Sequence, residues 1–220
     1  QVRSSRWDAV EVAEVRSLCD AAGIRRVSVA KTDLDEEIER GNHQGVVADT
    51  KDFPYANLET VLKGIGDRTT ACILVLDQVQ DPQNLGAILR AAAAFSVDAV
   101  VIPKDRAAAI TSTVIRASSG LAYRVPVAIA TNVARTLSRL KEEGFWTVGA
   151  FMDGDSTTWD MDFKMKTALV MGGESKGIRP LVEKGCDFRT RIPMHSGVES
   201  LNVGVATAIM LYEIHKQIER

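Results

Sequence analysis

From residue 71 to the end of the chain, apolar runs alternate regularly with amphipathic stretches, and this alternation constrains the fold more than any other feature. Residues 72–76 form a continuous apolar run, which is typical of a strand buried on both faces of a parallel sheet. A helix is expected from about residue 84 to residue 95, because Asp81-Pro82 supplies an N-cap and a first-turn proline. Further strands are expected at residues 99–102, 125–129, 146–150, 168–171 and 189–192, and further helices at residues 111–117, 132–143 and 178–184. The sequence therefore predicts an α/β fold whose mostly parallel sheet is covered by helices on both faces.

Residues 1–66 are polar and charge-rich and follow a different pattern. Expected here are helices at residues 10–22 and 33–40, strands at residues 27–30 and 46–48, and a turn at residues 41–45. Asn42 and His43 belong to this turn, with a contact to substrate as the alternative. The alternation predicts a small α/β unit. Gly64 and Gly66, followed by Asp67 and Arg68, form a polar break, so the predicted domains are residues 1–66 and 67–220.

Composition excludes several classes of protein. The 220 residues are 45% hydrophobic, which is enough for a real core. No run of about 18 uncharged apolar residues is present that could span a membrane. Cys19, Cys72 and Cys186 form no C-x-x-C pair, which argues against a zinc site or a disulfide framework and suits a reducing cytoplasm. The net charge of -2 and the isoelectric point near 6.0 lack the basic footprint of a nucleic-acid-binding protein, so any RNA contact must come from local patches.

Three stretches at predicted strand ends carry polar residues suited to chemistry, and ligands bind at these ends in open parallel sheets. In the first stretch, residues 77–90, Asn84 and Arg90 lie six residues apart. A helix would place their side chains about 120 degrees apart, so both could border one cleft. Gly86 costs a helix roughly 1 kcal/mol relative to alanine and indicates close backbone approach. A capping Asn and a surface Arg on an amphipathic helix are the plain alternative.

The second stretch, G-G-E-S-K-G-I-R-P at residues 172–180, follows the strand expected at residues 168–171. Its glycines would let the backbone approach a ligand, and Glu174 could hold a hydroxyl or a cationic group. It is not a Walker loop, because Lys176 is followed by Gly rather than by Ser or Thr. The chain also lacks G-x-G-x-x-G after a strand, which weakens a dinucleotide interpretation. An ordinary strand-to-helix turn is the alternative.

The third stretch is R-I-P-M-H-S-G-V-E-S-L-N-V at residues 191–203. An extended segment and a loop lead here into a helix, whose buried face is formed by Val203, Ala206, Met210 and Ile214. Ser200 and Asn202 lie at the helix entrance, where free backbone N–H groups face any ligand. Helix capping by Ser200 is the plain alternative. His195 has no His or Cys partner at ligand spacing, so no metal site is expected.

Taken together, N-L-G-A-I-L-R, M-G-G-E-S-K-G-I and I-P-M-x-x-x-V-x-S-L-N-V resemble the SpoU (TrmH-type) family of S-adenosylmethionine-dependent RNA 2'-O-ribose methyltransferases, part of the SPOUT superfamily. The three motifs occur in family order and at family spacing over residues 71–220. N-H-Q-G-V-V-A at residues 42–48 resembles the small ribosomal-protein-like substrate-binding domain of members that methylate a guanosine of large-subunit ribosomal RNA. The opening strand of that domain is expected to be absent or altered.

This resemblance implies a deep trefoil knot formed by the C-terminal segment, a bent S-adenosylmethionine in the knot, and a homodimer whose active site borders both subunits. By position, it implies that the cofactor is bound by Ala150, Gly172, Ile192, Met194 and Leu201. The catalytic set that it implies is Asn84, Arg90, Glu174, Ser200 and Asn202. One departure is Gly204, where relatives commonly have Ser.

The implied chemistry is consistent with these residues. A ribose 2'-hydroxyl is a poor nucleophile, whereas a sulfonium methyl group is already activated, so the enzyme must mainly align them and help to remove one proton. Alignment can supply roughly 7–11 kcal/mol, which makes a metal unnecessary. The family proposal is that the residue matching Arg90 assists deprotonation, but a guanidinium resists deprotonation, so phosphate anchoring fits Arg90 better. Lys104, Arg116 and Arg124 are candidate contacts to the RNA backbone or ordinary surface charges.

Three alternatives stay open at this point. A tRNA substrate is the first, although simpler tRNA enzymes carry terminal helical extensions in place of the N-terminal domain. The second is a non-catalytic RNA-binding assembly factor on a retained knot. A nicotinamide-dependent dehydrogenase is the third, and the missing glycine fingerprint weakens it.

Overall fold

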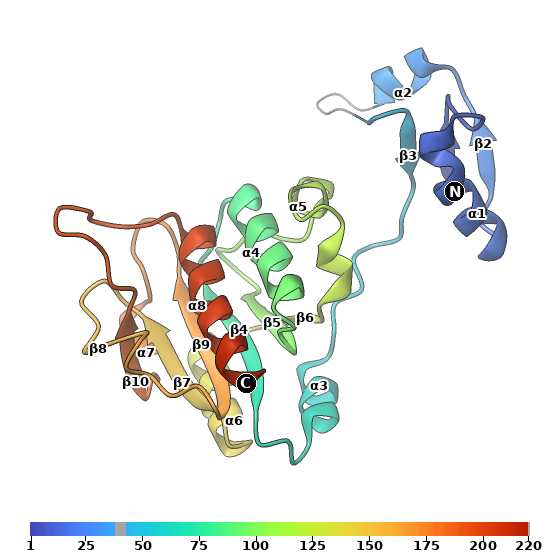
Figure 1. The fold of residues 1–220 in the computed structure, drawn as a ribbon. Coiled ribbons are helices and arrows are strands. Elements are labelled where there is room, and N and C mark those ends of the chain that lie inside the picture. Colours follow the sequence, from blue (N-terminus) through green and yellow to red (C-terminus); the bar gives the residue numbers. More distant parts are fainter. Residues whose placement is uncertain (38–42, 220) are drawn as a thin grey trace. The chain divides into compact units, whose positions relative to one another are not determined.

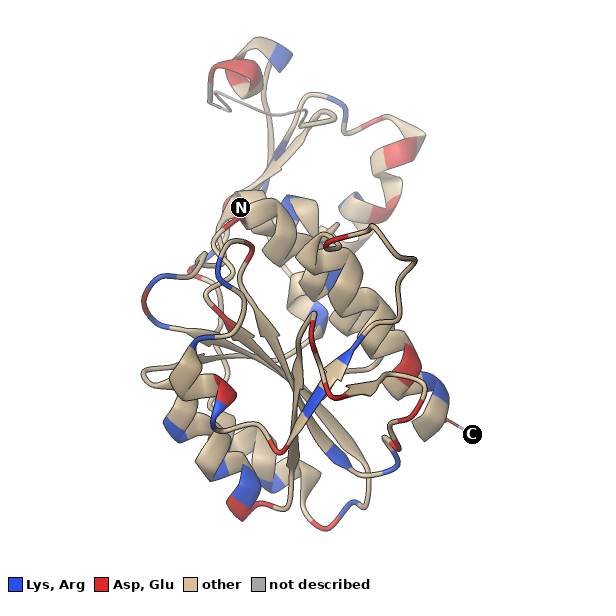
Figure 2. Cartoon of the chain, turned by 90° about the vertical axis from the view of Figure 1, so that its left-hand side faces the viewer, with Lys and Arg blue, Asp and Glu red and all other residues tan. Residues whose placement is uncertain are grey.

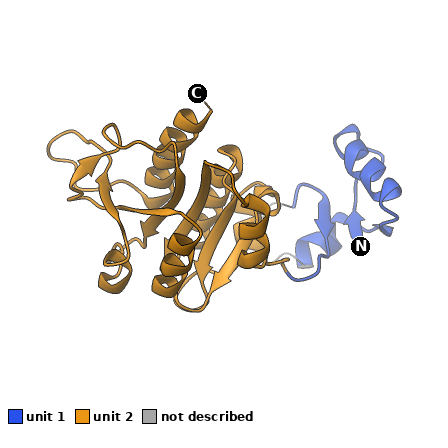
Figure 3. Cartoon of the chain, turned by 90° about the horizontal axis from the view of Figure 1, so that it is seen from below, with its two compact units in different colours: residues 1–52 blue, residues 53–220 orange. Residues whose placement is uncertain are grey.

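The computed structural model describes residues 1–37 and 43–219 (Figure 1). The chain divides into two compact units, Gln1–Asp52 and Phe53–Arg220 (Figure 3). The sequence predicts this boundary at residue 66, but α3 (Leu58–Ile65) belongs to the second unit. Asn57 caps α3 by accepting a hydrogen bond from the backbone N–H of Thr60, and the apolar side of α3 is buried in the core of the second unit. Apolar residues at 58, 61, 62 and 65 are a helical signal that the adjacent glycines conceal.

The first unit is a three-stranded sheet with short helices. Its elements are β1 (Val2–Ser4), η1 (Val10–Val12), α1 (Ala13–Ala21), β2 (Arg26–Ser28), α2 (Lys31–Glu37) and β3 (Val46–Ala48). β1 is central, parallel to β2 and antiparallel to β3, so the opening strand that the sequence did not predict is present. The predicted helix at residues 33–40 begins earlier, at Lys31. Residues 38–42, including Asn42 of the predicted turn, lie outside the described residues.

The second unit confirms the predicted parallel sheet. Its described strands form one seven-stranded sheet in the order β6-β5-β4-β9-β7-β10-β8, and all their pairings are parallel. The strands are β4 (Ala71–Asp77), β5 (Ala99–Pro103), β6 (Val127–Ala130), β7 (Trp146–Ala150), β8 (Ser156–Thr157), β9 (Lys166–Gly172) and β10 (Phe188–Arg191). The two-residue β8 is the one described strand of this sheet that the sequence does not predict.

Helices cover both faces of this sheet, because alternate residues of β4 face two separate cores. Leu74 and Leu76 pack into one core with α4 (Pro82–Ala94), α5 (Ser112–Ala117) and α8 (Val203–Ile218). Ile73 and Val75 pack into the other core with α3, α6 (Val133–Glu142) and α7 (Pro180–Glu183). A short η2 (Leu121–Arg124) follows α5. Among residues 1–37 and 43–219, none of the helices combines the length and the hydrophobicity that a membrane span requires.

Gly86 lies in α4 where this helix packs against α5. A Cβ added at Gly86 would lie 2.3 Å from the Cβ of Ala117 and 3.0 Å from the carbonyl oxygen of Val114. The close backbone approach expected from this glycine is therefore an approach to a neighbouring helix.

Replacing Gly86 by Ala is expected to lower the free energy of unfolding by roughly 1–3 kcal/mol, because the extra methyl group must push α5 away. Gly64→Ala is the matched control, since a Cβ at Gly64 in α3 meets no heavy atom within 4 Å. That substitution is expected to stabilise the protein by about 0.5–1 kcal/mol through helix propensity alone. Urea unfolding of both variants measures the difference, and equal stabilities of the two variants would contradict the packing argument.

Candidate active site

A cavity of about 650 Å³ lies at the carboxyl ends of β7, β9 and β10 and at the entrance of α8. This is the edge of the sheet where the sequence predicts a ligand site. All five residues assigned to cofactor binding line it, namely Ala150, Gly172, Ile192, Met194 and Leu201. Glu174, Ser200 and Asn202 of the predicted catalytic set line it as well. The structure thus brings together in one cavity eight residues that come from three separate segments of the chain.

The glycines of the loop after β9 are required by contacts within the chain. A Cβ at Gly172 would lie 2.2 Å from the carbonyl carbon of Gly177, and one at Gly173 would lie 2.2 Å from the carbonyl oxygen of Gln78. The backbone N–H of Gly177 donates to the carbonyl of Gly173 at 3.1 Å, which closes the loop on itself. These glycines therefore shape the wall of the cavity by close packing of backbone on backbone.

An ion pair between buried Asp77 and partly exposed Arg179 anchors the far end of this loop. Asp77, fully buried at the end of β4, accepts hydrogen bonds from the backbone N–H and the side-chain Nε of Arg179, both at 2.8 Å. Sequence reasoning missed this pair. The available signal was a charged residue, Asp77, placed directly after the apolar run at residues 72–76. The pair holds the end of the loop at residues 173–179 against the start of the connection from β4 to α4. The wall of the cavity is therefore fixed at both ends of the loop.

Glu174, Asn84 and Asn202 form a continuous hydrogen-bonded chain. The Asn84 Nδ2 donates to Glu174 Oε1 at 2.9 Å, and the Asn202 Nδ2 donates to Asn84 Oδ1 at 2.8 Å. Glu174 also accepts from the backbone N–H groups of Gln80 and Asp81, at 3.4 and 3.3 Å. Burial tends to raise the pKa of Glu174, but these hydrogen bonds outweigh it and hold the pKa below its ordinary value. Glu174 is therefore an ionised acceptor at neutral pH.

The direction of each hydrogen bond in the series Glu174–Asn84–Asn202 is determined by the contacts of Glu174 at one end and of Asn202 at the other. An ionised carboxylate can only accept, so Glu174 requires the Nδ2 of Asn84 to face it. At the other end, the Asn202 Oδ1 accepts from the backbone N–H groups of Gly204 and Val205, at 2.9 and 3.3 Å, and caps α8. Asn202 must then present its Nδ2 to Asn84. The helix cap is thus Asn202 rather than Ser200, whose side chain is left to the cavity.

Arg90 lies apart from the hydrogen-bonded series formed by Glu174, Asn84 and Asn202. Its Nη1 donates to Ser119 Oγ at 3.1 Å, and Arg90 is not among the described residues that line the cavity. Six residues along α4 correspond to about 9 Å of helix, which separates Arg90 from Asn84. The expectation that Asn84 and Arg90 border one cleft is therefore not met within a single chain.

The remaining candidates lie elsewhere. Lys104, Arg116 and Arg124 are all exposed, in the loop after β5, in α5 and in η2. The His195 Nδ1 pairs with the carbonyl of Ser196, at 2.8 Å, in an exposed loop. Across residues 1–37 and 43–219, no group of three or more His, Cys, Asp or Glu side chains converges as a metal site would require.

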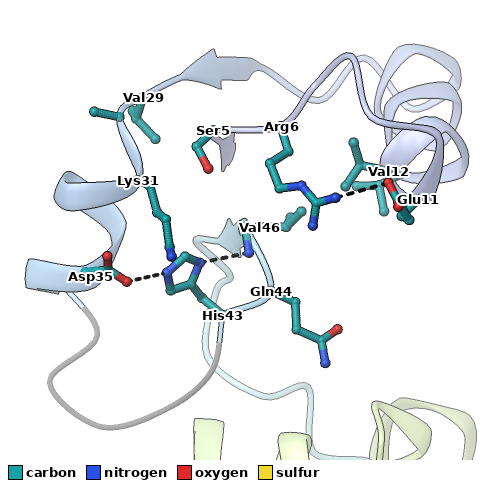
Figure 4. A pocket seen from close by; sticks show the side chains of 13 residues that line it. Ser5, Arg6, Glu11, Val12, Val29, Lys31, Asp35, His43, Gln44 and Val46 are labelled. Carbon is teal, nitrogen blue, oxygen red and sulfur yellow. Dashed lines mark hydrogen bonds and ion pairs between the residues drawn. The ribbon is translucent and has the colours of Figure 1, made fainter.

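The first unit has a cavity of its own, of about 1060 Å³, around His43 (Figure 4). The His43 side chain is almost fully buried, at 6% exposure. Its Nδ1 accepts from the backbone N–H of Gly45 at 2.9 Å, which leaves Nε2 to donate to Asp35 at 2.8 Å. Arg6, paired with Glu11, and Lys31 add cationic groups to the lining (Figure 4).

Comparisons with known proteins place these features in one family. A model of the SpoU rRNA Methylase family matches residues 71–212. A 23S rRNA (guanosine-2'-O-)-methyltransferase, RlmB, from Pseudomonas aeruginosa is 43% identical over 208 residues, covering 92% of this chain and 83% of that protein. RlmB from Coxiella burnetii is 40% identical over 200 residues, covering 90% of this chain and 80% of that protein.

Solved structures agree in fold. The AdoMet bound rRNA methyltransferase from Sinorhizobium meliloti matches with a TM-score of 0.80 and 25% identity, covering 99% of this chain and 79% of that chain. The TrmH/SpoU tRNA modifying enzyme of A. aeolicus matches with a TM-score of 0.62 and 28% identity, covering 74% of this chain and 82% of that chain. The extent of the family match and the identity to both RlmB proteins lead to one conclusion: this chain belongs to the SpoU rRNA methylase family.

Proposed function

We propose that this protein transfers the methyl group of S-adenosylmethionine to the ribose 2'-hydroxyl of a guanosine in large-subunit ribosomal RNA. The observation that carries the proposal is the cavity at the strand ends, bordered by the oriented chain Glu174–Asn84–Asn202. Two similar proteins, from Pseudomonas aeruginosa and Coxiella burnetii, are named for this activity on 23S rRNA.

The cavity suits S-adenosylmethionine in size and chemistry. Its volume of about 650 Å³ lies within the range of roughly 300–1,000 Å³ that is typical of sites for small molecules. Ile192, Met194 and Leu201 offer apolar surface, and the turns at Gly172 and after β7 offer backbone groups at the strand ends. When bound, S-adenosylmethionine supplies an activated methyl group on a sulfonium, so the protein has to hold the acceptor hydroxyl in line with it.

The polar residues would serve that alignment. Glu174 is committed to three N–H donors, so its role is to orient the Asn84 amide rather than to accept the proton of the ribose hydroxyl. Asn84 and Asn202 each keep one further N–H group, and Ser200 keeps its hydroxyl, for contacts with substrate. Arg90 would anchor an RNA phosphate next to the reacting sugar, because guanidinium binds phosphate in a bidentate manner and stays charged.

The proposed active site requires a homodimer, because Arg90 lies outside the cavity of its own chain. α8 carries exposed apolar side chains at Val205, Ile209 and Tyr212, which recur at helical spacing on one side. α8 is almost free of charged residues until its C-terminal end, as Figure 2 shows. Such a face is suited to a second copy of the chain, whose Arg90 would reach the cavity of the first.

The C-terminal segment is proposed to form the trefoil knot that the family resemblance implies. Support comes from its path: β10 is inserted between β7 and β8, and the following loop at residues 192–202 joins the loop after β9 in lining the cavity. The chain then ends in α8, which packs beside α4. A cytoplasmic location is also part of the proposal, and Cys19, Cys72 and Cys186 are all free thiols, as a reducing compartment requires.

The first unit is proposed to bind the RNA substrate and to favour ribosomal RNA over tRNA. The rRNA methyltransferase structure covers 99% of this chain, whereas the tRNA modifying enzyme covers 74% of it. A tRNA enzyme of that kind therefore lacks a counterpart for about a quarter of the residues. His43, Arg6 and Lys31 around the cavity of the first unit are the candidate contacts.

The test combines binding with transfer. Isothermal titration should show that the wild-type protein binds S-adenosylmethionine, and that Asn84→Ala and Arg90→Ala variants bind it but transfer no methyl group to large-subunit rRNA. A strain that lacks the gene should lose one 2'-O-methyl mark in that RNA. Loss of a tRNA mark with intact rRNA would overturn the substrate assignment. Cofactor binding without transfer to any RNA would favour a non-catalytic assembly factor.

A further inference from the structure

Ser119, which belongs to none of the three motifs, holds the side chain of Arg90. Among the described residues, the hydroxyl of Ser119 is the hydrogen-bond partner of the Arg90 guanidinium, at 3.1 Å. We propose that Ser119 is a positioning residue that fixes the guanidinium of Arg90 for methyl transfer. The inference deepens the proposed function and rests on the role given there to Arg90.

The backbone conformation at Ser119 favours glycine over serine. Ser119 has a φ of 54° and is followed by Gly120 with a φ of 78°, so both residues are in the left-handed region. Glycine adopts this region without steric cost after a helix, whereas a serine there is disfavoured. Keeping a strained side chain at position 119 is expected where that side chain has a function.

The neighbouring Ser118 provides a contrast within the same turn. Ser118 is fully buried, and its hydroxyl donates to the carbonyl of Ile115 at 2.9 Å and accepts from the backbone N–H of Ala122 at 3.2 Å. The local structure of the turn is therefore stabilised by Ser118. Ser119 is exposed and directs its hydroxyl to Arg90 instead.

Arg90 and Ser119 lie where α4 and α5 pack closely against each other. Gly86 and Arg90 are four residues apart in α4, so they lie on the same side of this helix. Gly86 allows α4 to approach Ala117, which lies two residues before Ser119. The end of α5 is thus seated directly on α4 beside Arg90, and the hydroxyl of Ser119 has a fixed position from which to orient the guanidinium.

Ser119→Gly separates positioning from stability. The substitution removes the hydroxyl and relieves the left-handed strain, so the thermal unfolding midpoint should stay the same or rise. The kcat of methyl transfer should fall about tenfold, as expected for the loss of a hydrogen bond to a charged group. The affinity for S-adenosylmethionine should not change, because Ser119 is not among the residues lining the cavity. Ser119→Asn should retain more activity than Ser119→Gly, since Asn tolerates this φ and offers an acceptor oxygen.

Ser96→Gly is the matched control. Ser96 is also an exposed serine of the second unit with a left-handed backbone, at φ 53°, and it lies between α4 and β5 away from Arg90. This variant should gain the same relief of strain and keep the wild-type kcat. A wild-type kcat in Ser119→Gly, the same loss in both glycine variants, or no benefit of Asn over Gly at position 119 would each overturn the inference.

A second readout keeps this inference separate from the proposed function. If the wild-type protein transferred no methyl group, the proposed function would fail, but the side-chain dynamics of Arg90 could still be measured. NMR relaxation of the Arg90 Nε–H group should show a restricted side chain in the wild-type protein and a mobile one in Ser119→Gly. Equal mobility in the two proteins would show that Ser119 does not position Arg90.

Discussion

Asn84→Asp is expected to lower the kcat of methyl transfer about 100-fold at neutral pH, because it places a second carboxylate against Glu174. The Asn84 Nδ2 lies 2.9 Å from Glu174 Oε1, so the substitution exchanges a hydrogen bond for a like-charge contact. Repulsion at this distance disfavours ionisation of both carboxyls together, and a cost of about 3 kcal/mol is reasonable for keeping both ionised at neutral pH. The activity of the variant relative to wild type should therefore rise as the pH is lowered from 8 to about 6, where the pair more easily shares a proton.

The same chain of hydrogen bonds predicts a rescue. In the double variant Asn84→Asp with Glu174→Gln, the Gln side chain at position 174 can donate to the Asp at position 84. In the wild-type protein the Asn202 Nδ2 donates to Asn84 Oδ1, and the Asp can still accept this hydrogen bond. We expect the double variant to be at least about tenfold more active than Asn84→Asp, although one backbone N–H loses its acceptor. Asn132→Asp is the control, since Asn132 caps α6 and Asp caps a helix equally well. A double variant no better than Asn84→Asp would mean that the direction of the hydrogen bonds is unimportant.

The sequence predicted best those parts of the fold that depend on long apolar runs. β4 and β9 are buried on both faces, and the parallel sheet built on them was predicted from this pattern. The strands β1 and β8 were missed because they have three and two residues and include polar side chains. Short strands of this kind are specified by their partners in the sheet, which a single sequence does not show.

The candidate site was also predicted only in part. The sequence placed the stretches that carry Asn84, Glu174 and Asn202 at strand ends, and the structure links Asn84 by hydrogen bonds to each of the other two residues. Contacts such as Asp77 with Arg179, which are 102 residues apart, depend on the tertiary fold and leave no local pattern. The separation of Arg90 from the cavity could not be predicted for the same reason. Helical spacing gives the angle between Asn84 and Arg90, but not the surface that each of them faces.

Arg90 and Asn84 are expected to serve two different active sites of one dimer, although they lie on the same helix. Arg90→Ala and Asn84→Ala homodimers should each be almost inactive. A heterodimer of the two variants, isolated with two different affinity tags, has one intact site if Arg90 acts across the interface. Its activity should then be about half that of the wild-type dimer.

The reciprocal heterodimer pairs a wild-type chain with a chain that carries both substitutions. If Arg90 acts across the interface, the intact cavity of the wild-type chain faces a partner without Arg90, and the other cavity lacks Asn84. This heterodimer should be almost inactive. If each chain contained a complete site, the two results would be exchanged: the reciprocal heterodimer would keep about half the activity, and the first heterodimer would keep almost none. The position of Arg90 beside Ser119, outside the cavity of its own chain, favours the first outcome.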